Sequence, residues 1–93
     1  MTDPQRKNLE RLRELGSVTY RHTNTGIRNG KWVMGRTKAS AKGFHSVALR
    51  SLVELEKANL EIVHYQNPWD GNGEIILPGG TEYLVERFTP CEP

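Results

Sequence analysis

The longest helical periodicity in the chain lies between Phe44 and Leu60, and it constrains the fold more than any other feature. Apolar residues cover about two thirds of the circumference of this segment when it is drawn as a helix. The apolar positions are Phe44, Val47, Ala48, Leu49, Leu52, Val53, Leu55, Ala58 and Leu60. A stripe this wide is typical of a central helix with neighbours on two sides. We therefore expect residues 44–60 to form the middle of the core.

The other segments alternate between helix and hairpin patterns. Asp3 and Pro4 are typical of a helix start, and Gly16 is typical of a helix end. The remaining patterns predict a loose hairpin over Val18–Met34, a hairpin over Glu61–Leu77 and a short helix over Glu82–Phe88. The expected fold is a small α+β domain, with a helix, a hairpin insert, a central helix, a two-stranded hairpin and a short C-terminal helix.

The length of 93 residues predicts a single domain over residues 1–93, of which 89–93 are expected to be a frayed tail. No apolar run approaches the roughly 20 residues that span a bilayer, so we expect no membrane segment and no secretory leader. A single cysteine, Cys91, excludes an internal disulfide. These features fit a reducing, cytoplasmic setting.

Charge is distributed unevenly along the chain, although the net charge is only +2. Between Leu15 and Val53 there are seven basic residues and no acidic one, whereas residues 54–93 hold eight acids and two bases. Such asymmetry favours a polyanion partner on one side of the molecule. The alternative is an ordinary solvated surface whose two halves attract each other.

Enzyme and metal motifs are missing from the sequence. His22, His45 and His64 belong to three different predicted elements, and none has an acidic or cysteine companion nearby in the chain. HExxH, CxxC, GxSxG and phosphate-loop patterns do not occur. The sequence therefore predicts a protein that is not an enzyme and that has no cofactor and no metal site.

The basic stretch that leads into the central helix has the layout of a helix-turn-helix. With Gly43 as the turn glycine, Ala39 lies four residues before it, and Leu49 and Leu52 lie six and nine residues after it. This spacing resembles the helix-turn-helix of bacterial and phage transcription regulators. Lys38 and Lys42 stand at first-helix positions that are usually apolar. Residues 36–42 are thus either a helix or a basic loop.

The chain as a whole resembles a small winged helix-turn-helix domain. Residues 50–63 (RSLVELEKANLEIV) are similar to the end of that family's recognition helix, where a leucine-rich helix runs into the first strand of the wing. Asn59 stands where the family often has glycine. The resemblance covers most of the chain, and it implies that Glu61–Leu77 forms the wing.

The resemblance implies a role in binding double-stranded DNA, because the amino-terminal turns of a recognition helix enter the major groove. The implied base contacts are His45, Ser46 and Arg50. The implied phosphate contacts are Arg28, Lys31, Arg36, Lys38 and Lys42. One small domain binds DNA with modest affinity, so we expect a homodimer on a palindromic site.

A second hypothesis stays open beside a DNA-binding regulator. The acidic C-terminal half and the wing tip, which carries Asp70 and no cation, favour a protein partner. Trp69 is the candidate anchor for that partner. On this hypothesis the chain is a phage- or mobile-element-encoded module that binds and inhibits a host protein or nucleoprotein complex.

Overall fold

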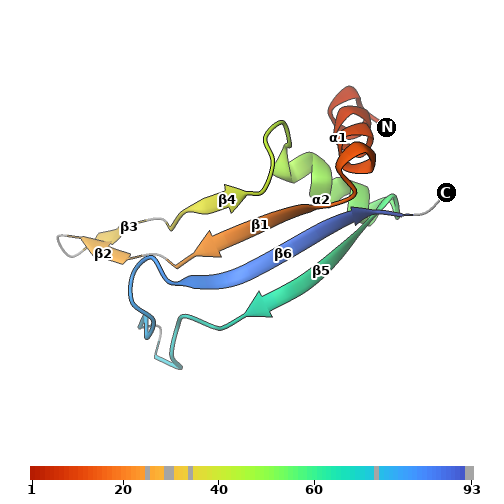
Figure 1. Ribbon diagram of the computed structural model, residues 1–93. Coiled ribbons are helices and arrows are strands. Elements are labelled where there is room, and N and C mark those ends of the chain that lie inside the picture. Colours follow the sequence, from red (N-terminus) through yellow and green to blue (C-terminus); the bar gives the residue numbers. More distant parts are fainter. Residues whose placement is uncertain (25, 29–30, 34, 73, 92–93) are drawn as a thin grey trace. The chain divides into compact units, whose positions relative to one another are not determined.

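The computed structural model describes residues 1–24, 26–28, 31–33, 35–72 and 74–91, with side chains for all of these except 26–28 and 31–33. The helices are α1 (Asp3–Leu15) and α2 (Ser46–Glu54) (Figure 1). The strands are β1 (Val18–Thr23), β2 (Gly26–Arg28), β3 (Lys31–Val33), β4 (Thr37–Ala39), β5 (Ala58–Tyr65) and β6 (Glu82–Pro90). Neither described helix is long and apolar enough to cross a membrane.

Four of the strands form one antiparallel sheet in the order β4-β1-β6-β5 (Figure 1). β1 and β6 are the inner strands of this sheet, and β4 and β5 are its edges. β2 and β3 form a separate antiparallel pair, in which Gly26 is opposite Val33 and Arg28 is opposite Lys31. The α+β class predicted from the sequence is confirmed, with two described helices where three were expected.

Contacts between residues divide the chain into two compact units. The helical unit comprises Met1–Thr19, Ala39–Glu61 and Arg87–Pro93, and it contains both α1 and α2. The sheet unit comprises Tyr20–Lys38 and Ile62–Glu86. Each unit has buried residues of its own.

α1 begins behind a capping box. The Thr2 hydroxyl accepts a hydrogen bond from the backbone N–H of Gln5 at 3.3 Å, and the Gln5 side chain accepts one from the N–H of Thr2 at 2.8 Å. The cap is therefore Thr2, and Asp3 is already the first helical residue. Gly16 ends the helix with a φ of 83°, a left-handed conformation that glycine adopts readily.

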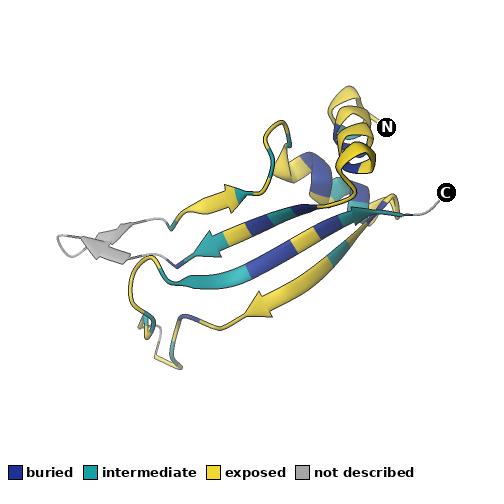
Figure 2. Cartoon of the chain, viewed as in Figure 1, coloured by how far each residue is buried: buried dark blue, intermediate teal, exposed yellow. Residues whose placement is uncertain are grey.

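The core of the helical unit forms where α1 packs on α2 (Figure 2). Its buried apolar residues are Leu9, Leu12, Val18, Ala48, Leu49, Leu52, Ala58 and Phe88. Gln5 Nε2 also donates to the Ser51 hydroxyl at 2.9 Å, which joins the two helices directly. Burial of a leucine or phenylalanine contributes about 1.5–3 kcal/mol. These side chains therefore hold the two helices together.

α2 is shorter than the helix predicted over Phe44–Leu60. It ends at Glu54, and Glu56 follows with a left-handed φ of 60°. The chain then enters β5, whose first residue, Ala58, is buried. The wide apolar stripe of the sequence thus combines a short helix with the start of a strand. Val47 belongs to the helical part of the stripe, and it is exposed instead of buried.

The short helix predicted over Glu82–Phe88 is wrong, because these residues belong to the inner strand β6. The prediction used the spacing of Leu84 and Phe88. Residues four apart share one face of a helix, but they also share one face of a strand. Pairing with strands on both sides decides between the two structures. β6 continues through Thr89 and Pro90, which the sequence assigned to the tail.

The two predicted hairpins are also paired differently. β5 pairs with β6, and the segment expected as the second wing strand contributes only an isolated bridge between Trp69 and Ile75. β1 lies between β4 and β6, so the first hairpin is limited to β2 and β3. Residues 36–42 form β4 and a loop, and they contain no helix. The first helix of a helix-turn-helix is therefore not formed there.

Hydrogen bonds of Asn24 and Thr23 hold the segments of the sheet unit together. Asn24 is buried, its N–H donates to Thr81 O at 2.9 Å, and its Nδ2 donates to Leu77 O at 2.8 Å. Thr23 and Arg36 are joined by two hydrogen bonds. The Thr23 N–H donates to the Arg36 carbonyl at 2.8 Å, and the Arg36 N–H donates to the Thr23 hydroxyl at 2.8 Å. These bonds fix the entry into β4 beside the end of β1.

Candidate nucleic-acid interface

The start of α2 is fixed by a buried side chain of α1. His45 is the N-cap of α2, and its backbone N–H donates to Asn8 Oδ1 at 2.9 Å. Asn8 is 4% exposed, and its Nδ2 donates to Pro4 O within α1 at 2.7 Å. Both ends of this amide are therefore used, and α1 sets the position at which α2 begins.

The first turn of α2 carries no capping side chain and no acidic residue. His45 makes no side-chain cap, so the amide groups of the first turn are not satisfied by the N-cap side chain. Ser46 and Val47 follow on the surface, and Val47 is 76% exposed. An uncapped helix start of this kind favours a negatively charged partner, because the helix dipole is positive there.

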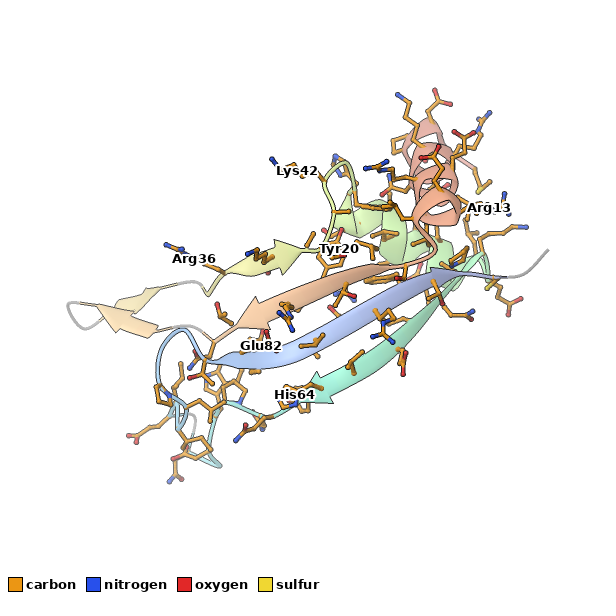
Figure 3. All side chains as sticks on the ribbon, in the orientation of Figure 1. Arg13, Tyr20, Arg36, Lys42, His64 and Glu82 are labelled. Atoms are coloured by element: carbon orange, nitrogen blue, oxygen red, sulfur yellow. The ribbon has the colours of Figure 1, made fainter. Side chains whose placement is uncertain are left out.

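Two cations lie at the loop that leads into this helix start. Lys42 is exposed on the loop before α2 (Figure 3). Arg11 of α1 approaches the same loop, since its Nε lies 3.9 Å from the position of a Cβ built on Gly43. Arg11 also forms an exposed ion pair with Glu14 at 3.6 Å. We call Arg11, Lys42, His45, Ser46 and Val47 the α2 amino-terminal surface.

Two members of this surface were missed by sequence reasoning. Val47 was assigned to the apolar face of the predicted helix, and it is exposed in the first turn of α2. Arg11 lies far from Lys42 in the sequence, and no local pattern signals their approach. The predicted residues Lys42, His45 and Ser46 do come together at the start of α2.

Arg50, the third predicted base contact, lies one turn further along α2. Its guanidinium carbon is 6.0 Å from the centroid of the Phe88 ring, which is buried in the core of the helical unit. Arginine over an aromatic face is a favourable arrangement that also buries the apolar stem of the side chain. Arg50 is an exposed residue that also contacts this core ring, and its predicted base contact stays a prediction.

The other predicted phosphate contacts belong to the sheet unit. Arg36 and Lys38 are exposed at and just before the edge strand β4, where Figure 3 shows Arg36. Arg28 and Lys31 are directly opposite each other in the β2–β3 pair, but their side chains lie outside the described part of the structure. The predicted phosphate contacts thus divide between the two units, with Lys42 alone in the helical unit.

Trp69, the candidate protein anchor, is 39% exposed in the sheet unit. Its N–H donates to Asn67 Oδ1 at 3.1 Å, and its backbone bridges to Ile75. The following turn is also closed, because Asp70 Oδ1 accepts from the N–H groups of Asn72 and Glu74 at 2.8 and 2.9 Å. The backbone of Trp69 is therefore held on both sides, by Asn67 and by Ile75.

His22 has polar partners that the sequence did not indicate. Its Nε2 is 2.7 Å from Oε1 of Glu86, and its Nδ1 is 3.0 Å from the Thr37 hydroxyl. Glu86 is 3% exposed, so His22 supplies a hydrogen bond to a buried carboxylate. Glu86 is distant in sequence, and sheet pairing alone brings it to His22. Among the described residues no three His, Cys, Asp or Glu side chains are placed to hold a metal ion.

Comparison with family models, curated proteins and solved structures gives no match for this chain.

Proposed function

We propose that the protein binds double-stranded DNA through the α2 amino-terminal surface and regulates transcription. The observation that carries the proposal is the start of α2, where an exposed first turn without a side-chain cap follows a loop that carries Lys42 and that Arg11 approaches at Gly43. Phosphate oxygens suit this arrangement, because backbone N–H groups and cations both stabilise them. The adjacent side chains of His45 and Ser46 carry polar groups for base edges.

The proposal keeps part of the winged-helix resemblance. α2 has the role of the recognition helix, and the basic loop before it contacts phosphates. The β5–β6 hairpin, which follows α2 in the chain, takes the place of the expected wing. Val47 joins the base contacts, since a valine methyl can pack against the methyl group of thymine.

Charge reversal at one lysine tests this assignment against a matched control. Lys42→Glu removes a cation beside the start of α2, whereas Lys57→Glu makes the same charge change beyond the end of that helix. Loss of one phosphate contact lowers affinity about eightfold near 0.1 M salt. Anisotropy titration with a labelled generic duplex should therefore show that loss for Lys42→Glu and a much smaller one for Lys57→Glu. Equal effects of the two variants contradict the assignment.

The second candidate function is the binding of a host protein or nucleoprotein complex. Trp69 favours it, because an exposed tryptophan is a common anchor at protein interfaces. Failure of the wild-type protein to bind duplex DNA, together with loss of biological activity in Trp69→Ala, would support this function over DNA binding.

A further inference from the structure

β5 is an edge strand whose last residues are exposed. It pairs with β6 on one side, and no other described strand lies on its second side. Residues 61–65 are all exposed, and three of them are large and apolar. The exposed fractions are 52% for Ile62, 47% for Val63 and 60% for Tyr65. This edge therefore presents both apolar side chains and the backbone groups of an unpaired strand.

The exposed residues lie on both faces of the sheet. Ile62 and Val63 are consecutive, so their side chains point to opposite faces. A helix or a flat protein surface can cover only one of these faces. A further strand beside β5 places its own side chains next to those of β5 on both faces. Its backbone also pairs with the outward N–H and C=O groups of β5. Residues 58–65 contain no lysine and no proline, the residues that commonly protect an exposed edge.

We infer that the occupant of this edge is the β5 strand of a second copy of the chain, in antiparallel pairing about a two-fold axis. With the axis at Val63, Val63 lies opposite its own copy, Ile62 lies opposite His64, and Glu61 lies opposite Tyr65. Glu61 is the only Asp, Glu, Lys or Arg of β5, and it already lies 3.4 Å from Arg87 of its own chain. No like charges meet, and a tyrosine hydroxyl faces each carboxylate.

The opposite edge of the sheet does not suit this pairing. β4 has only three residues, and Lys38 is the central one. Antiparallel self-pairing about the centre of β4 sets Lys38 against its own copy, with Arg36 nearby on both chains. Like charges directly opposite each other destabilise a strand pair. The charge pattern therefore selects β5 as the dimer edge, and this inference does not depend on DNA binding.

Such a dimer is small and symmetric. A pair of short strands buries less than the roughly 1,200–2,000 Å² of a standard interface, so we expect a dissociation constant of about 10–100 μM. The two-fold axis makes the interface isologous, with the same residues on both sides.

Sedimentation equilibrium over about 10–500 μM protein tests the inference. The wild type should dimerise, Val63→Lys should be monomeric because it sets two lysines against each other, and Ile76→Lys should dimerise as the wild type does. Ile76 is the matched control, an exposed apolar residue outside β5. A monomeric wild type at about 500 μM overturns the inference, and so does a Val63→Lys dimer as stable as the wild type.

Disulfide cross-linking locates the axis even where Val63→Lys disturbs folding. In a Cys91→Ser background, each of residues 59–65 is replaced by cysteine in turn. Air oxidation should give cross-linked dimer at Val63→Cys and little at Asn59→Cys, because antiparallel pairing carries residue 59 away from its own copy. Uniform cross-linking along the strand contradicts a defined pairing at β5.

Discussion

At the scale of single residues, Asn8 links the fold to the candidate interface. Its side chain is buried, and it joins α1 to His45, the N-cap of α2. The His45 N–H donates to Asn8 Oδ1 at 2.9 Å. The sequence gives no sign of this role, since an asparagine beside a leucine stripe resembles a surface residue. Its position follows from the packing of two helices that are far apart in the chain.

Asn8→Ala should destabilise the protein by about 1–3 kcal/mol, because the His45 N–H loses its acceptor and the Pro4 carbonyl loses its side-chain donor. Urea denaturation followed by circular dichroism measures the change in the free energy of unfolding. Asn72→Ala is the control, since its side chain is exposed in a turn; we expect a change within about 0.5 kcal/mol. Similar losses for both variants contradict the role of Asn8.

His22 and Thr37 offer a second matched pair. His22→Ala removes a hydrogen bond to the buried Glu86 carboxylate, which should cost about 1.5–3 kcal/mol. Thr37→Val removes only the exposed bond to the other ring nitrogen, so a change within about 0.5 kcal/mol is expected. The same urea denaturation experiment measures the change in the free energy of unfolding for both variants. A Thr37→Val loss as large as that of His22→Ala shows that the buried contact is not the important one.

The residues of the candidate site were predicted unevenly. Lys42, His45 and Ser46 were expected on the surface at the start of the central helix, and they are found there. Arg50 packs over Phe88, a residue of a distant strand that was predicted to be helical. Local pattern therefore located the helix start, while the surroundings of each side chain depended on strand pairing.

At the scale of elements, Gly35 shows how closely β4 approaches β1. A Cβ at this position would overlap the backbone oxygen of Thr23 and would lie 2.7 Å from that of Asn24. Both atoms belong to the main chain, so they cannot move aside as a flexible side chain can. Glycine at position 35 is therefore required for the chain to enter β4 along the end of β1.

Gly35→Ala should destabilise the protein by at least about 2 kcal/mol, because the backbone must shift to admit one methyl group. Gly71→Ala is the control, because a Cβ there has no heavy atom within 4 Å. Replacing that glycine should leave stability unchanged or raise it by up to about 1 kcal/mol. Thermal unfolding measures the melting temperature of each variant. Equal melting temperatures for Gly35→Ala and Gly71→Ala would show that a methyl group at position 35 is tolerated beside Thr23 and Asn24.

The strands were harder to predict than the helices for a physical reason. The capping box and Gly16 fix α1 locally, so its range was predicted almost correctly. The identity of β6 depends on pairing with β1 and β5, which lie far away in the chain. The end of α2 likewise depends on the burial of Ala58 in β5. Where a segment satisfies both helical and strand periodicity, these distant partners decide its structure.

At the scale of the whole molecule, the basic stretch between Leu15 and Val53 is divided between the two units. Five of its seven bases belong to the sheet unit, and Lys42 and Arg50 belong to the helical unit. In the sheet unit Arg21 is paired with Glu82 at 3.3 Å. One of the positive charges of the basic stretch is thus paired with an acidic residue of the carboxyl-terminal half. Among the side chains of this stretch that the structure describes, Arg36, Lys38 and Lys42 are exposed.

The salt dependence of DNA binding tests the central proposal most directly. The wild-type protein is titrated with a labelled generic duplex at about 50 and 200 mM salt, and the association constant is measured by anisotropy. With about four to six phosphates neutralised, the logarithm of this constant should fall with the logarithm of salt at a slope near −4 to −5. Absence of binding at micromolar duplex in about 50 mM salt, or a slope near zero, contradicts the proposal.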